Sequence, residues 1–549
     1  MNHRTGGTRP DPRYHRWMLL ISFAISAFPA IGAPKLPVVS KWARFEHAFQ
    51  STLTYSNALQ DATLTVVFTS PLGETNQVFG FWDGGKTWLV RFSPNLPGRW
   101  TFKSACSDKA NKGLNDQTGE FVCTAAIATT RFARHGQIHV AGDRRHFEHA
   151  DGTPFFWLAD SVWNGARISA IKDWKLYASV RSSQGFTVAQ WTATPGADAH
   201  GVRAFSGTER ISINPNFFKP LDAKLEALSR AGILSAIVPF GHMDGSESAT
   251  LPDDQIALLL RYIEARWGAD PVAWLLPFDR ETETNNIARW KKPGAAIFGV
   301  SHRAPVLVSA GQRQQILDEF RDQTWVDAFA YEPLSDLTDE ALKLATSGPF
   351  ANEWKKEPTR PVIPSAPYEN ALARDSKKRF TSDAVRRAIY SSLLLSPPAG
   401  VSYGAQGVID WDKTLDQPPK RKAALPLWHR ALFMPAAKQI GHLSKFVSGI
   451  DFWRLRPQPG FVSVQPGMLS PERFIASAGT EAKDCSLVYV PQERTLEIVI
   501  EALPSSPSVN WFNPRTGQNT PGVAVVGGRS CQFPTPEPGD WLLVMKAGK

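Results

Sequence analysis

Carboxylates and aromatic side chains follow several apolar runs in the middle of this 549-residue chain. The clearest case is the uncharged run PVAWLLPF at 271–278, which ends abruptly in Asp279, Arg280 and Glu281. Apolar runs of this length are typical of strands that are buried on both faces. A carboxylate directly after such a strand lies where barrel enzymes carry their chemistry. A helix N-cap, or an ion pair between Asp279 and Arg280, is the structural alternative.

The same pattern recurs on both sides of this run. Eight apolar runs alternate with helix-like segments between residues 131 and 450. They are FFWLAD (155–160), GFTVAQW (185–191), GILSAIVPF (232–240), the run before Asp279, APVLVS (304–309), VDAFAYE (326–332), RPVIPSAPYE (360–369) and AGVSYG (399–404). Eight strand–helix units over roughly 300 residues predict a (β/α)8 TIM barrel. A parallel doubly wound sheet is the rival fold, but no G-x-G-x-x-G motif follows the first run.

In such a barrel, the polar residues after each strand share one cleft. We expect Asp279 to be the proton donor of a hydrolytic pair and Glu369 the leading second carboxylate, because strands four and seven face each other. The other candidates for contact with a substrate are Asp160, Trp163, Gln190, His242, Arg280, Glu281, Glu332, Tyr368, Tyr403 and Gln406. Carboxylates with aromatics, without metal-ligand spacing or a phosphate loop, are typical of glycosidases, so we expect neither a metal nor a cofactor.

Five of these residues also have a structural interpretation. Glu369 could cap a helix, and Asp160 could pair with a neighbouring charge instead of a sugar hydroxyl. His242 could be a hydrogen-bonded structural histidine. Trp163 is either a platform for a sugar ring or part of a core. Tyr403 either orients the second carboxylate or packs at the end of its strand.

The segments on either side of the barrel are predicted to be all-β. Short β-rich runs separated by Gly, Pro and Asn, such as TLTVVFTS and TWLVRFSP, fill residues 36–127, and SLVYVP and TLEIVIEAL lie within 451–549. Regularly spaced short strands of this kind favour β-sandwiches. The sequence therefore predicts a multidomain protein, with a barrel over 131–450 between two sandwiches.

Several motifs carry a resemblance to a known family. FFWLADSVWNG, QGFTVAQ, INPNFFKPLDAKLEALSRAGI, VAWLLPFDRE and PAGVSYGAQGVIDW together resemble the apiosidase-like glycoside hydrolases. VFGFWDGGKTWLVRFSPNLPGRWTF resembles the sandwich ahead of the barrel in many bacterial carbohydrate-active enzymes, and WFNPRTG with GDWLLV resembles the collagen-binding-type sandwich behind it. The resemblance implies a glycoside hydrolase acting on a plant or microbial polysaccharide.

Three departures from that family surround the expected cleft. The acid motif W-x-x-x-G-D-R reads WLLPFDR here, with Phe278 in place of the glycine. The nucleophile motif G-E-P-x-Y-E reads SAPYE, with Ala366 at the first Glu and one residue fewer, and VSAGQ follows strand five where the family has a His-Pro nearby. Either Glu369 takes over as nucleophile, or Glu281 or Glu332 serves, or the protein is a silent carbohydrate-binding barrel or an exopolysaccharide scaffold.

The N-terminus has the features of a secretory signal over residues 1–33. Four arginines, at positions 4, 9, 13 and 16, precede the apolar stretch 17–28, and small residues follow at 30, 32 and 33. No later stretch is long and apolar enough to span a membrane. We expect an exported protein, periplasmic or extracellular, without a stable span once the signal is cleaved; an uncleaved anchor is the alternative.

The cysteines and the charge fit this expectation. Export favours disulfides, and two local pairs, Cys106 with Cys123 and Cys485 with Cys531, are the natural choice. The 61 Lys and Arg residues against 51 Asp and Glu give a formal net charge of +10. That charge could favour an anionic polysaccharide as the carbohydrate partner. No dense Lys/Arg block suggests nucleic acid. The sequence leaves the oligomeric state open.

Overall fold

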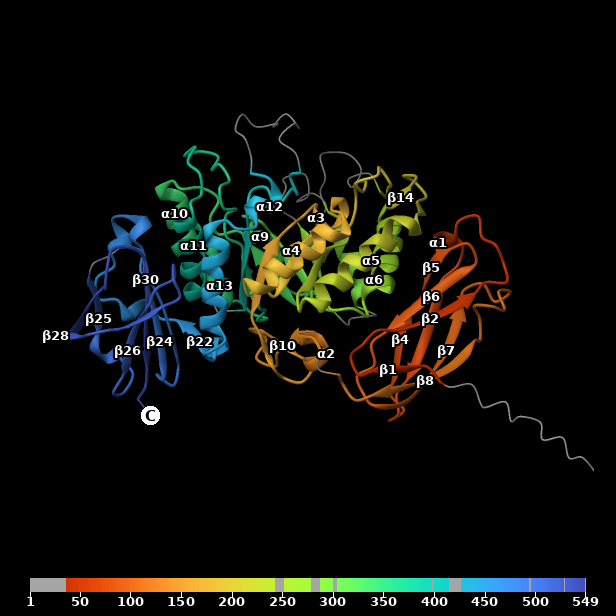
Figure 1. The fold of residues 1–549 in the computed structure, drawn as a ribbon, viewed down its shortest axis with the longest axis horizontal. Helices are drawn as coiled ribbons and strands as arrows, with labels where there is room; N and C mark the ends of the chain where they lie inside the picture. Colours follow the sequence, from red (N-terminus) through yellow and green to blue (C-terminus); the bar gives the residue numbers. More distant parts are fainter. Residues whose placement is uncertain are drawn as a thin grey trace, which may run out of the picture.

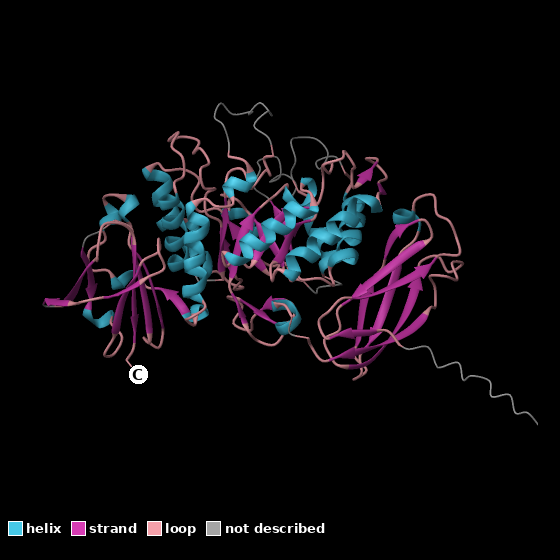
Figure 2. Ribbon diagram, viewed as in Figure 1, coloured by secondary structure: helices cyan, strands magenta, loops and turns pink. Residues whose placement is uncertain are grey.

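The protein is a row of three parts, a helix-covered barrel between two β-sandwiches (Figure 1). This computed structural model describes residues 36–127, 129–241, 251–277, 287–299, 304–396, 399–413, 426–492, 495–527 and 529–548. The predicted signal segment lies outside these ranges. Figure 2 shows mainly strands, with a few short helices, at the two ends and longer helices around the strands of the middle part.

The N-terminal part is a sandwich of a five-stranded and a three-stranded sheet, in the orders β1-β8-β7-β3-β4 and β2-β6-β5. Every second residue of β7 is buried, the alternation of a strand with one face on a core. Aromatic rings fill the space between the sheets, with Phe45 stacked on Phe121 at 4.0 Å and Phe68 on Phe92 at 4.2 Å. The strands are β1 (Val38–Ser40), β2 (Phe45–Gln50), β3 (Leu64–Thr69), β4 (Thr75–Phe79), β5 (Phe81–Gly84), β6 (Thr87–Phe92), β7 (Gly98–Cys106) and β8 (Thr118–Thr124), with a one-turn helix α1 (Ala58–Asp61).

The middle part confirms the predicted barrel. Its eight strands form one parallel sheet in the order β20-β19-β18-β17-β16-β13-β12-β21, and a parallel bridge between Ser365 and Ser402 brings the two ends together. Each strand falls within one of the eight predicted runs or overlaps its end. The strands are β12 (Trp157–Ser161), β13 (Val188–Thr192), β16 (Leu234–Val238), β17 (Val272–Pro277), β18 (Val306–Ser309), β19 (Ala328–Tyr331), β20 (Val362–Pro364) and β21 (Gly400–Gly404).

Helices cover the outside of this barrel. The main ones are α4 (Ile171–Ser183), α5 (Pro215–Arg230), α6 (Asp253–Trp267), α8 (Ile287–Phe298), α9 (Gln314–Phe320), α10 (Asp339–Ser347), α11 (Ser382–Leu395) and α13 (Pro435–Val447). Short elements complete it: α2 (Arg131–His135), α3 (Gly165–Ile168), α12 (Trp428–Ala431), the 3-10 helix η1 (Pro349–Lys355), a small sheet of β9 (Ile138–Val140), β10 (Phe147–His149) and β11 (Pro154–Phe155), and a hairpin of β14 (Phe205–Ser206) and β15 (Ser212–Ile213). None of the helices among the described residues combines the length and apolar character needed to cross a membrane.

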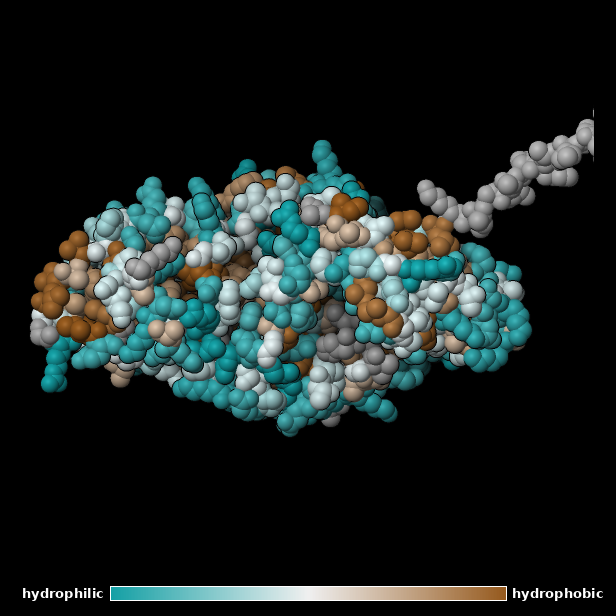
Figure 3. All heavy atoms as spheres, turned by 90° about the horizontal axis from the view of Figure 1, so that it is seen from below, coloured by the Kyte–Doolittle hydropathy of each residue, from teal (hydrophilic) through white to brown (hydrophobic). Residues whose placement is uncertain are grey.

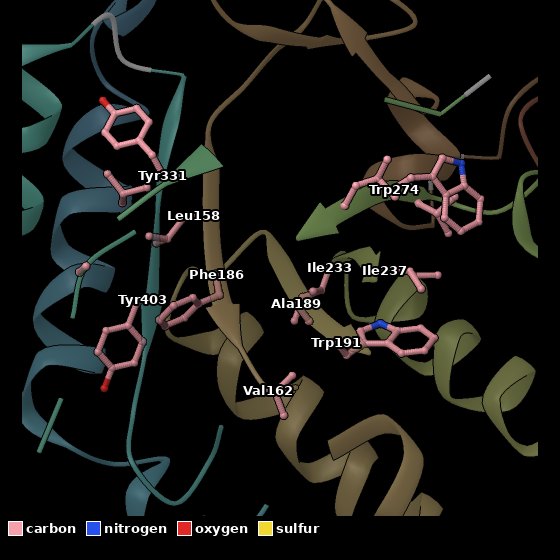
Figure 4. Close-up of a cluster of buried hydrophobic side chains, with 14 of the residues drawn as sticks. Leu158, Val162, Phe186, Ala189, Trp191, Ile233, Ile237, Trp274, Tyr331 and Tyr403 are labelled. Atoms are coloured by element: carbon pink, nitrogen blue, oxygen red, sulfur yellow. The ribbon is translucent and has the colours of Figure 1, made fainter. Parts of the chain in front are cut away.

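Alternation along each barrel strand divides its residues between two cores. The interior core is made mostly of small and aliphatic side chains, among them Ala159, Val188, Leu234, Ala236, Ala273, Leu307, Ala328, Ala330 and Ile363. Residues of opposite parity, such as Leu158, Ala189 and Trp274, pack outward against the helices (Figure 4). A strand residue can therefore be assigned to the interior or the outer layer by its parity.

The C-terminal part is a second sandwich, of six and three strands in the orders β22-β23-β24-β30-β26-β27 and β25-β29-β28. Its strands are β22 (Leu455–Pro457), β23 (Ala476–Thr480), β24 (Cys485–Val490), β25 (Thr495–Val499), β26 (Ser508–Phe512), β27 (Asn519–Pro521), β28 (Val525–Gly527), β29 (Ser530–Pro534) and β30 (Trp541–Lys546). Apolar residues gather on the surface at this end of the molecule (Figure 3), and Val525 and Val526 of the edge strand β28 are exposed.

Buried ion pairs join both sandwiches to the barrel. Arg91 of β6 donates to Asp222 on α5 at 2.9 Å and to the carbonyl of Arg266 at 2.7 Å. Arg266 itself contacts Asp222 at 2.7 Å and Asp83 of β5 at 2.9 Å. At the other end, Arg386 of α11 holds both carboxylate oxygens of Asp540, at 2.9 and 2.8 Å. Since breaking a buried pair is costly, these contacts fix the sandwiches against the barrel.

The predicted disulfides are not formed, and all four cysteines are free. In the β7–β8 ladder, Cys123 lies opposite Gly98 rather than Cys106. At about 3.3 Å per strand residue, that register separates the two cysteines by roughly 26 Å along β7, whereas a disulfide needs Cα atoms within about 7 Å. Cys485 and Cys531 lie in different sheets, on β24 and β29. The prediction was wrong because spacing in sequence reveals neither the register of paired strands nor the sheet to which a strand belongs.

Candidate functional site

A chain of hydrogen bonds links three neighbouring strands on the interior side of the barrel wall, just below its C-terminal end. Ser161 donates to the Oε1 of Gln190 at 3.1 Å, and Gln190 donates through Nε2 to the hydroxyl of Ser402 at 3.1 Å. Parity places all three residues on the interior side of β12, β13 and β21. Gln190 was predicted to contact a substrate. It is only 3% exposed and lies in a buried layer beneath the C-terminal opening of the barrel, which we call the mouth. The two serines were missed, although their parity marks them.

Two aromatic residues above this layer are joined to each other. The indole Nε1 of Trp163 donates to the hydroxyl of Tyr368 at 2.8 Å, and both side chains are half-buried. Trp163 packs against the interior core, and a side chain at Gly404 would clash with the ring of Tyr368. Glycine at that position therefore lets the Tyr368 ring lie against the end of β21. The structure brings these two predicted residues together as one wall of the mouth.

Glu332 follows strand β19 directly and continues its backbone hydrogen bonding to the neighbouring chain segment after β18. Its N–H donates to the carbonyl of Gly311 at 2.7 Å, extending the β18–β19 ladder by one step. Ala328 and Ala330 belong to the interior core, and Tyr331 packs outside on Phe350. Alternation therefore turns Glu332 toward the interior at the mouth. Its side chain is half-buried.

Asp160 turns to the opposite side of the barrel wall and does not line the mouth. Its Oδ2 accepts hydrogen bonds from Tyr177 at 2.9 Å and from the Nε of Arg181 at 2.7 Å, both on α4. The residue is 0% exposed. Burial raises the pKa of Asp160, and the guanidinium of Arg181 opposes that rise. The predicted contact with a sugar is corrected to a buried pair, because Asp160 has the outward parity of Leu158.

Glu369 also turns outward, to the first turn of α13. The Tyr403 hydroxyl donates to its Oε2 at 2.6 Å, and the N–H of Ala436 donates to its Oε1 at 3.1 Å. Glu369 is 4% exposed, and burial raises its pKa, although both hydrogen bonds lower it. Tyr403 packs on Phe186 in the outer core at 5.7 Å between ring centroids (Figure 4). This is the arrangement of a helix cap, the structural alternative for Glu369.

Of the remaining predicted residues, only Gln406 lies within the described ranges. Gln406 is 5% exposed, and its N–H donates to the carbonyl of Glu369 at 2.9 Å. Four predicted residues lie outside the described ranges, namely His242, Asp279, Arg280 and Glu281. Within the described part of the chain, no group of three or more His, Cys, Asp or Glu side chains could hold a metal ion.

The mouth therefore combines an aromatic wall, a buried layer of hydroxyl and amide groups, and an inward carboxylate. An aromatic face suits the apolar side of a ring, and a few placed polar groups fix orientation in a binding site. A single carboxylate can act as a general base or nucleophile, and hydrolysis of an acetal needs a second one. The described residues supply one member of such a pair.

Comparisons with known families cover most of the chain. Residues 141–454 match the family described as "Apiosidase-like, catalytic domain". Residues 38–107 match a domain of unknown function, DUF5060, and residues 470–546 match the "Putative collagen-binding domain of a collagenase". Among curated proteins, none matches this sequence.

Solved structures share the fold at low sequence identity. A "putative glycoside hydrolase" from Bacteroides vulgatus superposes with a TM-score of 0.69 at 16% identity, covering 93% of this chain and 99% of its own. A family 5 glycoside hydrolase from Bacteroides vulgatus gives 0.64 at 16% identity, covering 75% of this chain and 93% of its own. A third structure, described only as a glycoside hydrolase, gives 0.64 at 16% identity over 76% and 98%. At this identity the likeness concerns the fold.

Proposed function

This chain belongs to the apiosidase-like family of glycoside hydrolase-like barrels, and on that premise we propose that it hydrolyses glycosidic bonds in a plant or microbial polysaccharide. The observation that carries the proposal is the position of Glu332, a half-buried carboxylate directly after β19 with the parity of the interior residues Ala328 and Ala330. Hydrolysis of a glycosidic bond requires one carboxyl group to protonate the leaving oxygen and a second to attack the sugar or activate water.

We assign the proton donor to Asp279 on its sequence position and the second role to Glu332. Asp279 comes two residues after the end of β17, in the WLLPFDR motif. Strands β17 and β19 are separated only by β18, which places their backbones about 10 Å apart at 4.7–4.9 Å per strand spacing. Side chains that converge from this separation can reach the carboxylate distances of either glycosidase class, about 5–5.5 Å for retention or 6.5–9.5 Å for inversion.

Glu332 replaces Glu369 as the leading second carboxylate in this proposal. Glu369 has both oxygens engaged by Tyr403 and Ala436 on the outer side of the barrel wall. A nucleophile or base must reach the anomeric carbon or its water within the cleft. The inward parity of Glu332 meets that condition, whereas the placement of Glu369 does not.

A second function has one observation in its favour. Ala366 occupies the position where the family motif has its first Glu, and it is buried at 5% exposure in the outer core. A barrel that lost its nucleophile would keep the aromatic wall and the polar layer. It would then bind a carbohydrate without cleaving it, as an exported glycan-binding protein or scaffold. The N-terminal residues 1–33 support export in either case.

Release of reducing sugar from a panel of pectic, hemicellulosic and bacterial polysaccharides tests the proposal. We expect Asp279→Asn and Glu332→Gln each to lower the rate by about 100-fold or more, the usual contribution of an acid/base group. Glu369→Gln serves as the matched carboxylate control and is expected to keep most of the rate of the folded protein. Full activity of Glu332→Gln would refute its role. Release of sugar from no substrate, with measurable binding to one, would favour the silent barrel.

A further inference from the structure

A groove separates the N-terminal sandwich from the barrel rim. It has a volume of about 880 Å³ and is bounded by the β5–β6 hairpin on one side. The β14–β15 hairpin and the first turn of α5 form its other side. Figure 1 shows β14 at the rim beside the sandwich strand β5. The hydrolytic pair proposed above uses none of the residues that line this groove.

The sandwich wall of the groove carries an oriented tryptophan. Trp82 lies on β5 within the GFWDG motif, and its Nε1 donates to the carbonyl of Gly85 at 2.9 Å. Its partner in the ladder, Trp88, is buried at 3% exposure, whereas Trp82 is half-buried. Phe205 of β14 is half-buried on the opposite wall. A tryptophan whose ring is fixed and partly exposed offers an apolar face for stacking.

Polar groups border this aromatic surface. Asp83 follows Trp82 and is held by Arg266 at 2.9 Å and by Lys219 of α5 at 3.5 Å. Asn216, in the first turn of α5, is exposed at the edge of the groove. Amide, carboxylate and ammonium groups around an aromatic face are the partners that hydroxyl-rich rings need, since each hydroxyl both donates and accepts.

Two glycines that line the groove form the tip of the β5–β6 hairpin. Gly84 and Gly85 have φ values of +111° and +55°, and a Cβ at either position would meet no atom within 4 Å. Positive φ angles of this kind favour glycine, so the hairpin turn depends on these two residues. The two walls are also fixed relative to each other, because Arg91 contacts Asp222 of α5 and the Arg266 carbonyl of α6, and the Arg266 guanidinium contacts Asp83 of β5. Binding would therefore not require the walls to be ordered first, which favours affinity.

We propose that this groove is a second binding site for a carbohydrate chain, with Trp82 as its stacking platform. The site would hold a stretch of polysaccharide outside the barrel mouth and raise the local concentration of the polymer at the enzyme. The identity of the chain as substrate rests on the proposed function, but binding in the groove does not require cleavage.

Binding of soluble polysaccharides by the mature chain tests this site. The protein carries Asp279→Asn throughout, so that no substrate is consumed, and the probes are arabinoxylan, galactomannan, polygalacturonate and xanthan in affinity electrophoresis and calorimetry. We expect Trp82→Ala to lower the affinity for at least one probe about tenfold, through loss of stacking. Trp82→Phe should retain most of the affinity, and Asn216→Ala should lower it several-fold without disturbing a core.

Trp354→Ala is the matched control, since Trp354 is a half-buried tryptophan on η1 that does not line the groove. It should bind like the parent. Unchanged binding by a folded Trp82→Ala variant, or no binding of any probe by the parent, would overturn the proposal. Binding that depends on Trp82 in a protein whose wild type releases no sugar would keep the groove and refute the hydrolase. Sugar release by the wild type, without any binding that depends on Trp82, would support the hydrolase and refute the groove as a binding site.

Discussion

Tyr403 and Glu369 form a buried hydrogen bond of 2.6 Å that joins the last barrel strand to the segment after strand seven. The same carboxylate accepts the N–H of Ala436 in the first turn of α13. An anionic acceptor at a helix N-terminus satisfies a free donor and interacts favourably with the helix dipole. Glu369 thus connects β20, β21 and α13 at one point where the barrel closes, and its role is to stabilise that closure.

Tyr403→Phe is expected to destabilise the fold by about 1–3 kcal/mol, because it leaves a buried oxygen of Glu369 without its donor. Urea denaturation followed by circular dichroism would measure this change as a lower midpoint at unchanged slope. Glu369→Gln should act in the same direction, and sugar release per folded molecule should stay near the wild-type rate for both variants. A loss of activity of 100-fold with an unchanged midpoint would instead make Glu369 a catalytic residue.

Arg181 is expected to be among the most sensitive positions in the barrel wall. Both Arg181 and Asp160 have 0% side-chain exposure, so Arg181→Met would leave a buried carboxylate without its partner. We expect a loss of about 3–5 kcal/mol in the free energy of unfolding, measured in urea at pH 7. The control is Arg230→Met, which removes an exposed partner of Glu226 on α5 and should cost less than about 1 kcal/mol.

The double variant Asp160→Leu/Arg181→Met separates pairing from packing. It removes both charges and should recover part of the loss, since apolar replacements of buried pairs are often tolerated. Equal losses in Arg181→Met and Arg230→Met would show that the buried pair carries no special weight.

The barrel could be predicted from the sequence because its strands are buried on both faces. Such strands appear as continuous apolar runs, and the run before Asp279 became β17 with bounds Val272–Pro277. The same continuity hides which way each residue points. In a half-exposed strand, the alternation of apolar and polar residues shows which side chains point inward. Strand β12 is buried on both faces and has no such alternation, so its sequence did not show that Asp160 turns toward Arg181 on α4.

Which residues face the site depends on their parity along each strand, and parity can be counted only once the bounds of the strand are known. Counting from Ala328 and Ala330 assigns Glu332 to the interior, yet the count needs strand β19 to be located to the residue. Glu369 follows β20 by several residues, and its hydrogen bonds to Tyr403 and Ala436 are contacts across 34 and 67 residues of sequence. No local pattern encodes contacts of that range.

The cysteines give a direct chemical check of the fold at both ends. All four are free, and the β7–β8 register keeps Cys106 far from Cys123. Ellman titration of the purified protein, unfolded in guanidinium without reductant, should therefore count four thiols per chain. Treatment with dithiothreitol should leave the melting temperature unchanged, because no disulfide constrains the unfolded chain. A count of two or none would contradict the placement of the cysteines in at least one sandwich.

His149 should make the stability of the protein fall in mildly acidic solution. It lies on β10 at 2% exposure, with its Nδ1 at 2.8 Å from the carbonyl of Gly136, the geometry of a neutral ring donating one proton. Burial lowers the pKa of His149 to about 4 from its ordinary 6.5. Between pH 6.5 and about 4, His149 is therefore protonated in the unfolded chain but neutral in the folded protein.

This contribution of His149 to stability is complete above pH 6.5 and is lost as the pH falls toward 4. A shift of this size corresponds to about 3 kcal/mol at 1.36 kcal/mol per pKa unit. Urea denaturation at intervals from pH 7.5 to 4 would show the decline, and His149→Gln should be less stable at pH 7.5 but flatter across the range. A variant whose stability falls as steeply as that of the wild type would assign the acid sensitivity to other groups.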